Sequence, residues 1–465
     1  MIETFVICYA TLAIFSLLIA AQSYGNWRRI GGGEQLVIGA GLYYFSLYGA
    51  WTVLSIKRGV GSSSALDHLE ASLFRIEVDG NYLHSLILYG VFDALVLAGI
   101  WVLCRRFTDQ ETLPHSGFRA PRASSLITIS MLALVLSVAA LWGEIRAALD
   151  QGVPLYIFTR TEVSRWFKVH QLLNRVGLIS LACAWPIHLT RASVEHLKRP
   201  AIFVMSVVTG LWLVYLGALG NRSEVLVAVF AGFFLFVRLG ARIRWGRLFM
   251  AVFFAYFALR SIETLRAIPS QDLLDHFLLA LTDPEFWNPA SVASGSESLA
   301  AHVSMYGILA LSPPWIWGES AVYFVQSLLP FVPDTARVQD SYSIYAAAVG
   351  APQGQGFNIH FAAGSYLNFG PIGVVFGAIL LAALFAFVQA VSQWANRSPS
   401  MALPATLAYC YFCAMLPVSM RAGPEGLKAL IFEGYVIPFL IAMLAVRNVG
   451  PKSSQQGHGV TVRGA

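Results

Sequence analysis

The chain has 465 residues, of which 57% are hydrophobic and only 12% are charged. Its apolar runs repeatedly reach about 20 residues, the length of a membrane-spanning helix. This composition excludes a water-soluble globular protein and predicts one all-α, polytopic membrane domain. The formal charge of +6 comes from basic residues scattered over short loops, which encodes membrane orientation, so we expect no nucleic-acid partner.

The first apolar run, residues 4–21, follows the sequence MIE without a positive n-region, and Arg28 and Arg29 come after it. It is expected to be a retained span whose N-terminus lies outside. About 11 transmembrane helices are expected, and the later ones cover 36–56, 82–104, 126–141, 169–189, 202–219, 225–237, 248–258, 372–391, 402–418 and 427–446.

The charges of the loops agree with this topology. With the N-terminus outside and the C-terminus cytoplasmic, the inner loops hold 17 of the 31 Lys and Arg residues and four of the 25 acidic residues. The basic residues are Arg28, Arg29, Arg105, Arg106, Arg119, Arg122, Arg191, Lys198, Arg199, Arg238, Arg242, Arg244, Arg247, Arg397, Arg447, Lys452 and Arg463, and the acids are Glu34, Asp109, Glu111 and Glu195. These arginines are therefore interpreted as topology signals.

The outer side carries one large loop, residues 260–370, within a single membrane domain that covers 1–446. This loop is rich in Trp, Tyr, Pro and Gly, and residues 272–281 and 297–311 are expected to form amphipathic helices on the bundle or the membrane interface. A structured loop of this length is more often functional than a connector. The tail, residues 447–465, is polar and expected to be disordered.

The hairpin GNRSE places Arg222 and Glu224 between two spans, at the outer membrane interface. Both charges could simply reach from the hairpin to water. Other arginines share the outer side, however, and several guanidinium groups on one face would suit a diphosphate, which they grip with paired hydrogen bonds. These other arginines are Arg260, Arg266, Arg337 and Arg421.

Three stretches resemble bacterial O-antigen polymerases, the oligosaccharide repeat unit polymerases. They are GFNIHFAAGSYLNFGPIG (356–373), GESAVYFVQSLLPFVPDTARVQDSYSIY (318–345) and the hairpin GNRSEVL (220–226). The resemblance covers roughly residues 217–446, while the first 200 residues match only in hydropathy. It implies a glycosyltransferase of the bacterial inner membrane, with a periplasmic active face, that takes part in O-antigen, capsule or exopolysaccharide synthesis.

Such an enzyme transfers the growing glycan from polyprenyl diphosphate to the terminal sugar of an incoming lipid-linked repeat unit. The resemblance implies polyprenyl diphosphate-linked oligosaccharide, the lipid bilayer, a chain-length regulator and a flippase as partners. A donor activated by its own lipid diphosphate needs no nucleotide, and the sequence has no HExxH, P-loop or DxD motif. We therefore expect no cofactor and assign no metal ligand.

The transfer needs groups that stabilise the departing diphosphate and a base for the attacking hydroxyl. Arg222 and Arg421 are predicted for the first role, with Arg260 and Arg266 next and Arg337 as a further substrate-binding candidate. His360 is the predicted base because its imidazole titrates near neutral pH. The related ligases carry a His-Asn pair nearby, whereas Phe361 follows His360 here. Glu224, Asp340 and Glu425 are the alternative bases and substrate-binding candidates.

Four charged residues, Asp93, Arg175, Lys428 and Glu433, fall inside expected spans, where each needs a partner, water or a substrate cavity. Asp93 is interpreted as a structural partner of Arg175, and Glu433 could line the path of the acceptor. The outer aromatic residues could stack on sugars, but an interfacial belt is the preferred interpretation. These residues are Trp315, Trp317, Tyr342, Tyr345 and Tyr366.

Three other functions are kept open. One is a non-catalytic scaffold of an envelope assembly complex, because no residue is diagnostic of catalysis. An O-antigen ligase would use the same donor chemistry but move the finished glycan to a different acceptor. A lipid-linked oligosaccharide flippase belongs to another class: it would need charges inside many spans and no large one-sided loop, the reverse of this sequence.

Overall fold

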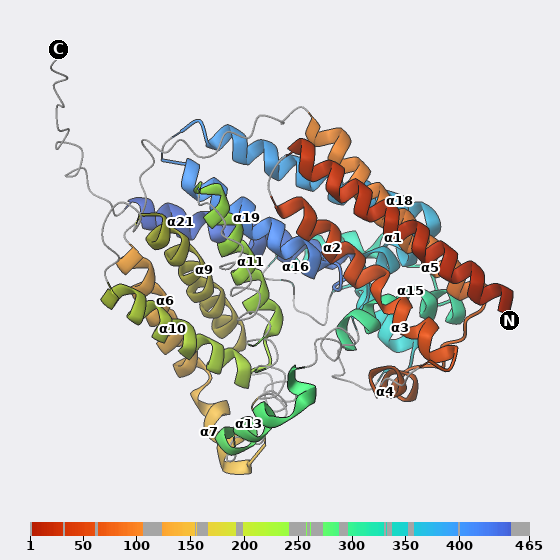
Figure 1. The fold of residues 1–465 in the computed structure, drawn as a ribbon, viewed down its shortest axis with the longest axis horizontal. Helices are drawn as coiled ribbons and strands as arrows, with labels where there is room; N and C mark the ends of the chain where they lie inside the picture. Colours follow the sequence, from red (N-terminus) through yellow and green to blue (C-terminus); the bar gives the residue numbers. More distant parts are fainter. Residues whose placement is uncertain are drawn as a thin grey trace.

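The computed structural model describes residues 2–30, 33–60, 64–105, 123–153, 155, 166–191, 199–240, 257, 261, 273–287, 296–329, 332, 337–351, 358–398 and 400–447. Nearly all of these residues are helical (Figure 1), and the described part of the chain contains no strand. An isolated parallel bridge joins Ile359 to Ala422. The all-α prediction is confirmed.

The helices follow one another along the whole described chain. They are α1 (Ile2–Ile30), α2 (Glu34–Ser46), α3 (Tyr48–Lys57), α4 (Ser64–Ser72), α5 (Gly80–Cys104), α6 (Ala123–Ala140), α7 (Trp142–Gln151), α9 (Phe167–Arg191), α10 (Arg199–Ala218), α11 (Arg222–Arg238), α13 (Leu273–Thr282), α15 (Ser296–Leu311), α16 (Glu319–Leu328), α17 (Ser341–Ala348), α18 (Phe361–Ala395), α19 (Ala402–Ser419), α20 (Leu427–Ile431) and α21 (Ile437–Arg447). Short 3-10 turns occupy Pro284–Trp287 and Pro424–Gly426, and a π-helical turn, Phe432–Val436, joins α20 to α21.

Nine helical stretches within the described residues are long and apolar enough to cross a membrane. They are Ile2–Ile30, Glu34–Lys57, Gly80–Cys104, Ala123–Ala140, Val169–Leu189, Pro200–Ala218, Phe361–Ala395, Ala402–Ser419 and Pro424–Leu444. Each overlaps one expected span. The expected span 225–237 corresponds to the 17-residue helix α11, and the expected span 248–258 and the tail beyond Arg447 lie outside the described residues. The chain is therefore a multi-pass membrane protein by helix length and composition.

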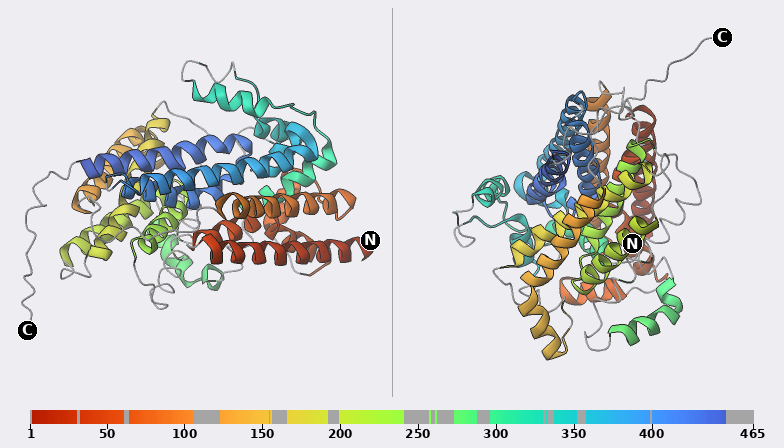
Figure 2. Two further views of the ribbon diagram at one scale, coloured as in Figure 1. Left: turned by 90° about the horizontal axis from the view of Figure 1, so that it is seen from above. Right: turned by 90° about the vertical axis from the view of Figure 1, so that its left-hand side faces the viewer.

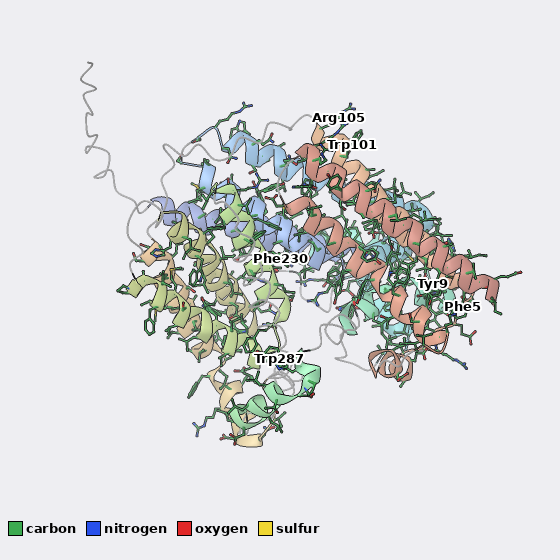
Figure 3. The ribbon with its side chains drawn as sticks, in the orientation of Figure 1. Phe5, Tyr9, Trp101, Arg105, Phe230 and Trp287 are labelled. Carbon is green, nitrogen blue, oxygen red and sulfur yellow. The ribbon has the colours of Figure 1, made fainter. Side chains whose placement is uncertain are left out.

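Helices α1 and α5 run parallel to each other. Asn26 donates a hydrogen bond to the carbonyl of Leu97 (3.0 Å), and three residues later the guanidinium of Arg29 lies 4.8 Å from the ring centre of Trp101. Figure 3 shows Trp101 and Arg105 at the end of this pair that is far from the N-terminus. Both helices thus end in basic residues on the same side, as expected if both cross from outside to inside.

Helix α19 connects two groups of helices. One group contains α1, α2, α3, α5, α15 and α18, and the other contains α6, α9, α10 and α11 (Figure 1). In the left view of Figure 2 the yellow and green helices lie beside the red and orange ones, with blue helices running across both groups. Helix α19 packs against α2 and α18 on one side and α11 on the other, and is buried along most of its length.

The first part of α18 doubles back on the rest. Phe369 and Gly370 leave the helical conformation, with φ of 61° at Gly370, and Pro371 then starts the long segment because it lacks the N–H that a continuous helix would need. A side-chain carbon at Gly373 would lie 2.0 Å from the carbonyl oxygen of Ser365. Residues 361–368 therefore pack directly against the start of the long segment, and glycine permits this approach.

Helix α15 differs from the expected amphipathic surface helix. Most of its residues from Ser298 to Ile308 are buried, and it packs between α2, α3, α5 and α18. Its polar side chains find partners inside: His302 contacts the hydroxyl of Tyr82 (3.0 Å) and the carbonyl of Ser46 (2.5 Å). The expectation of a helix lying on the bundle is wrong for this segment because polar residues can be buried when they are hydrogen-bonded.

Candidate functional site

A pocket of about 200 Å³ lies between α9, α11, α19 and the chain that follows α19. Residues from all four segments line it: Arg175, Leu178, Ile179, Ser223, Glu224, Val227, Tyr411, Met415, Val418, Ser419, Arg421, Ala422, Gly426, Ala429 and Glu433. From Val418 at its mouth to Tyr411 on the same helix, the pocket reaches about two helical turns into the bundle.

The contacts at the two ends of α11 show on which side of the helix bundle the pocket opens. The helix starts at the pocket, with Ser223 and Glu224, and ends at Arg238, whose Nε donates to Glu34 at the start of α2 (2.6 Å). Glu34 follows closely on the end of α1, so Arg238 lies on the side where α1 ends. The pocket therefore opens on the side where α1 begins, which is the outer side in the expected orientation.

An ion pair crosses the pocket. The guanidinium of Arg175 on α9 lies 2.6 Å from a carboxylate oxygen of Glu433, and the two side chains are 26% and 22% exposed. Glu433 belongs to the π-helical turn, a feature found often at functional sites. The expected pairing of Arg175 with Asp93 is thus wrong. Asp93 instead accepts a hydrogen bond from Ser46 on α2.

Arg421 and Glu224 face the same pocket from neighbouring segments. The guanidinium of Arg421 donates to the hydroxyl of Ser223 (3.0 Å) in the first turn of α11. The adjacent Glu224 has one buried carboxylate oxygen that meets no hydrogen-bond partner among the described side chains. The first N–H groups of α11 have no intrahelical partners, so this helix start favours an anion beside Arg421.

The remaining lining is mostly apolar. Leu178 and Ile179 on α9, Val227 on α11, and Met415 and Val418 on α19 form the walls beneath the charged groups. A polar mouth above apolar walls suits an amphiphilic ligand whose charged head meets the arginines and whose chain meets the walls.

Some of the predicted arginines cannot be compared with this pocket. Arg222 is the first residue of α11, at the mouth, but its side chain lies outside the described part of the structure. Arg260 and Arg266 lie outside the described residues altogether. Their predicted contacts with a diphosphate stay predictions.

Arg337 and Asp340 make contacts within the outer loop, and Glu425, in the turn after α19, contacts that loop; none of the three lines the pocket. Arg337 donates to the carbonyl of Val332 (3.0 Å). Asp340 caps α17 by accepting from the backbone of Ser343 (2.7 Å). The carboxylate of Glu425 accepts from both the backbone N–H (2.8 Å) and the hydroxyl (2.7 Å) of Ser341. The described geometry gives these three residues roles in holding the loop, and their substrate contacts stay predictions.

His360 is fully buried at the start of α18. Its Nδ1 accepts from the backbone N–H of Ala362 (3.1 Å), and its ring meets the ring of Tyr89 edge-on with 4.7 Å between centroids. Burial, together with the nearby His302, lowers the pKa of His360 from 6.5 to about 3. The imidazole is therefore neutral and closed off from the pocket, and its role as the base stays a prediction that this geometry does not support.

Two pocket residues were not predicted as site residues. Arg175 was interpreted as a structural partner, and Ser223 was not singled out. The available signal was the charge inside a span, since such a charge needs a partner, water or a cavity, and it did point to Glu433. The described residues contain no cluster of His, Cys, Asp and Glu side chains that could hold a metal ion.

Comparisons with protein-family models, with curated proteins and with solved structures found no match to this chain.

Proposed function

We propose that the chain polymerises lipid-linked oligosaccharide repeat units of a bacterial surface polysaccharide, from the outer face of the inner membrane. The observation that carries this proposal is the pocket, in which Arg175, Arg421 and the start of α11 lie above apolar walls. A polyprenyl diphosphate has the same division into an anionic head and an apolar chain. The resemblance of residues 217–446 to O-antigen polymerases supports the same substrate class.

The proposed reaction requires charge stabilisation where the leaving group forms. Arg421 can offer a guanidinium to one phosphate and, with the first N–H groups of α11, surround the developing negative charge. Arg175 can approach from the opposite wall, because its pairing with Glu433 leaves about a quarter of its side chain exposed. Because Glu433 is paired with Arg175, an incoming diphosphate competes with this carboxylate for the guanidinium.

The test is the size distribution of surface and lipid-linked glycan after deletion of the gene, with complementation by the wild type, by Arg421→Gln and by Arg58→Gln. Arg58 is exposed at the end of α3 and serves as the matched control. We expect deletion to reduce the glycan ladder to single repeat units. The wild type and the control restore the ladder, and Arg421→Gln lowers polymerisation about a hundredfold, as expected for the loss of one charge-stabilising donor.

Two other results would redirect the assignment. Long chains that accumulate on their lipid carrier after deletion would indicate a ligase. A ladder that deletion leaves unchanged would contradict the proposed function, whereas single repeat units trapped on the inner face would indicate a flippase.

A further inference from the structure

Three of the four groups considered as bases are held by backbone contacts. His360, Asp340 and Glu425 each accept a hydrogen bond from a backbone N–H at the start of a helix. None of them lines the pocket. A group that must take a proton from a substrate has to reach it directly or through one water, and these three do not face the pocket in which the substrate is proposed to bind.

The pocket itself contains two carboxylates, and they differ in their partners. Glu433 is paired with the guanidinium of Arg175 at 2.6 Å. The guanidinium competes with a proton for this carboxylate, so Glu433 is already engaged by a partner. Glu224 instead has a buried oxygen with no hydrogen-bond partner among the described side chains. An oxygen of this kind is costly to leave unsatisfied unless a ligand or water meets it.

The position of Glu224 also matches the geometry of the reaction. The guanidinium of Arg421, which follows α19, donates to the neighbouring Ser223 at 3.0 Å. A guanidinium for the diphosphate therefore lies beside the turn of α11 that carries the carboxylate for the hydroxyl. Arg175 and Glu433 face Glu224 from the opposite wall and act on it electrostatically. Tyr411 on α19 also lines the pocket, and Tyr215 on α10 interacts electrostatically with Glu224.

We propose that Glu224 is the general base of the transfer, an assignment that rests on the function proposed above. The hydroxyl oxygen of the acceptor sugar forms a bond to the anomeric carbon of the donor glycan while the bond from that carbon to the diphosphate oxygen breaks. The bonding electron pair leaves with the diphosphate, beside Arg421 and Arg175. The hydroxyl proton passes to Glu224 and is then released to water at the outer mouth. A neighbouring diphosphate strengthens a carboxylate as a proton acceptor because like charges disfavour ionisation.

The test uses the full chain purified into lipid vesicles, with lipid-linked repeat units as substrate and undecaprenyl diphosphate as the binding probe. Glu224→Gln is expected to lower the rate of transfer at least about a hundredfold, the usual contribution of a general base. Its affinity for undecaprenyl diphosphate is expected to stay within about threefold of the wild type, because the interaction lost is made only in the transition state. Glu77→Gln, which removes an exposed carboxylate just before α5, is the matched control.

The outcomes separate this inference from the proposed function. Wild-type protein that binds and extends nothing would overturn both. Wild-type transfer together with near-normal transfer by Glu224→Gln would overturn only the base assignment. If Glu224→Gln loses both binding and transfer, Glu224 is a binding residue, and the base assignment is overturned. If Glu224→Gln does not assemble, Glu224→Asp replaces it, and the same separation of transfer from binding is required.

Discussion

A charged pair lies near each end of α11, and the two pairs differ in burial. Near its start, Arg175 meets Glu433 across the pocket, and at its end Arg238 meets Glu34, with 2.6 Å between nitrogen and oxygen in both pairs. The side chains of the first pair are 26% and 22% exposed, whereas those of Arg238 and Glu34 are 17% and 2% exposed. The guanidinium of Arg238 also lies 4.5 Å from the ring centre of Tyr409.

Because of this difference, the Arg175–Glu433 pair can contact a ligand, whereas the Arg238–Glu34 pair can only stabilise the fold. A sealed pair cannot exchange partners, and removing one member leaves an uncompensated charge in a low-dielectric interior. A pair that is about a quarter exposed is partly screened by water, so it contributes less to stability than a buried pair and can release one partner to an arriving anion. Distance alone would rank the two pairs as equal, so exposure is the property that predicts their roles.

Breaking the sealed pair should have the largest effect on stability. Arg238→Gln leaves Glu34 without a countercharge and is expected to lower the free energy of unfolding by about 3–5 kcal/mol. Thermal unfolding in detergent measures this loss. The double variant Glu34→Gln/Arg238→Gln should regain much of it, and a single variant as stable as the wild type would show that the pair is not structural.

The next effect should appear in activity at the open end of α11. Arg222→Ala is expected to insert normally into the membrane but to lower polymerisation about a hundredfold, as the loss of one group on the diphosphate predicts. Glycan ladders report the activity, and the amount of protein in the membrane fraction is the control. Full-length product from this variant would remove Arg222 from the mechanism.

Breaking the Arg175–Glu433 pair should lower the rate of transfer more than the stability, whereas breaking the Arg238–Glu34 pair should mainly lower the stability. Arg175→Gln is expected to cost about 1 kcal/mol of stability or less, while transfer falls about tenfold through the loss of one charge-assisted contact. The same unfolding assay and the vesicle transfer assay measure both quantities. A stability loss as large as that of Arg238→Gln, with transfer unchanged, would reverse the roles given to the two pairs.

The last effect is a pH dependence of stability and concerns His360, which is fully buried. With its pKa lowered from 6.5 to about 3, the folded chain binds no proton there while the unfolded chain does, so stability is lost as the pH falls from about 6.5 toward 3, by up to about 1.4 kcal/mol per pH unit. His360→Asn can keep an N-cap and removes this titration. Unfolding temperatures at pH 7 and pH 5 should therefore differ less in the variant, and an unchanged difference would contradict it.

Much of the fold follows from local sequence. Apolar runs of sufficient length predicted the nine candidate spans, because a segment of about 20 apolar residues specifies a helix that satisfies its own backbone in lipid. The GNRSE hairpin and the loop at Arg421 were predicted at the outer ends of spans, and both reach the pocket. The expected span 372–391 begins directly after Pro371, where α18 reverses.

The partners of the buried charges came only from the tertiary structure. The sequence could show that Arg175 needed a partner, but α9 packs near the π-helical turn that carries Glu433, while Asp93 on α5 faces Ser46. Arg238 was interpreted as a topology signal in an inner loop, yet α2 and α11 enclose it with Glu34. His360 was predicted to be the base, but Tyr89 and Phe92 of α5 pack against its ring and it is fully buried. Hydropathy and charge are local properties that specify which segments are helices, whereas burial and pairing depend on which helices meet, and that is decided by packing between residues far apart in the chain.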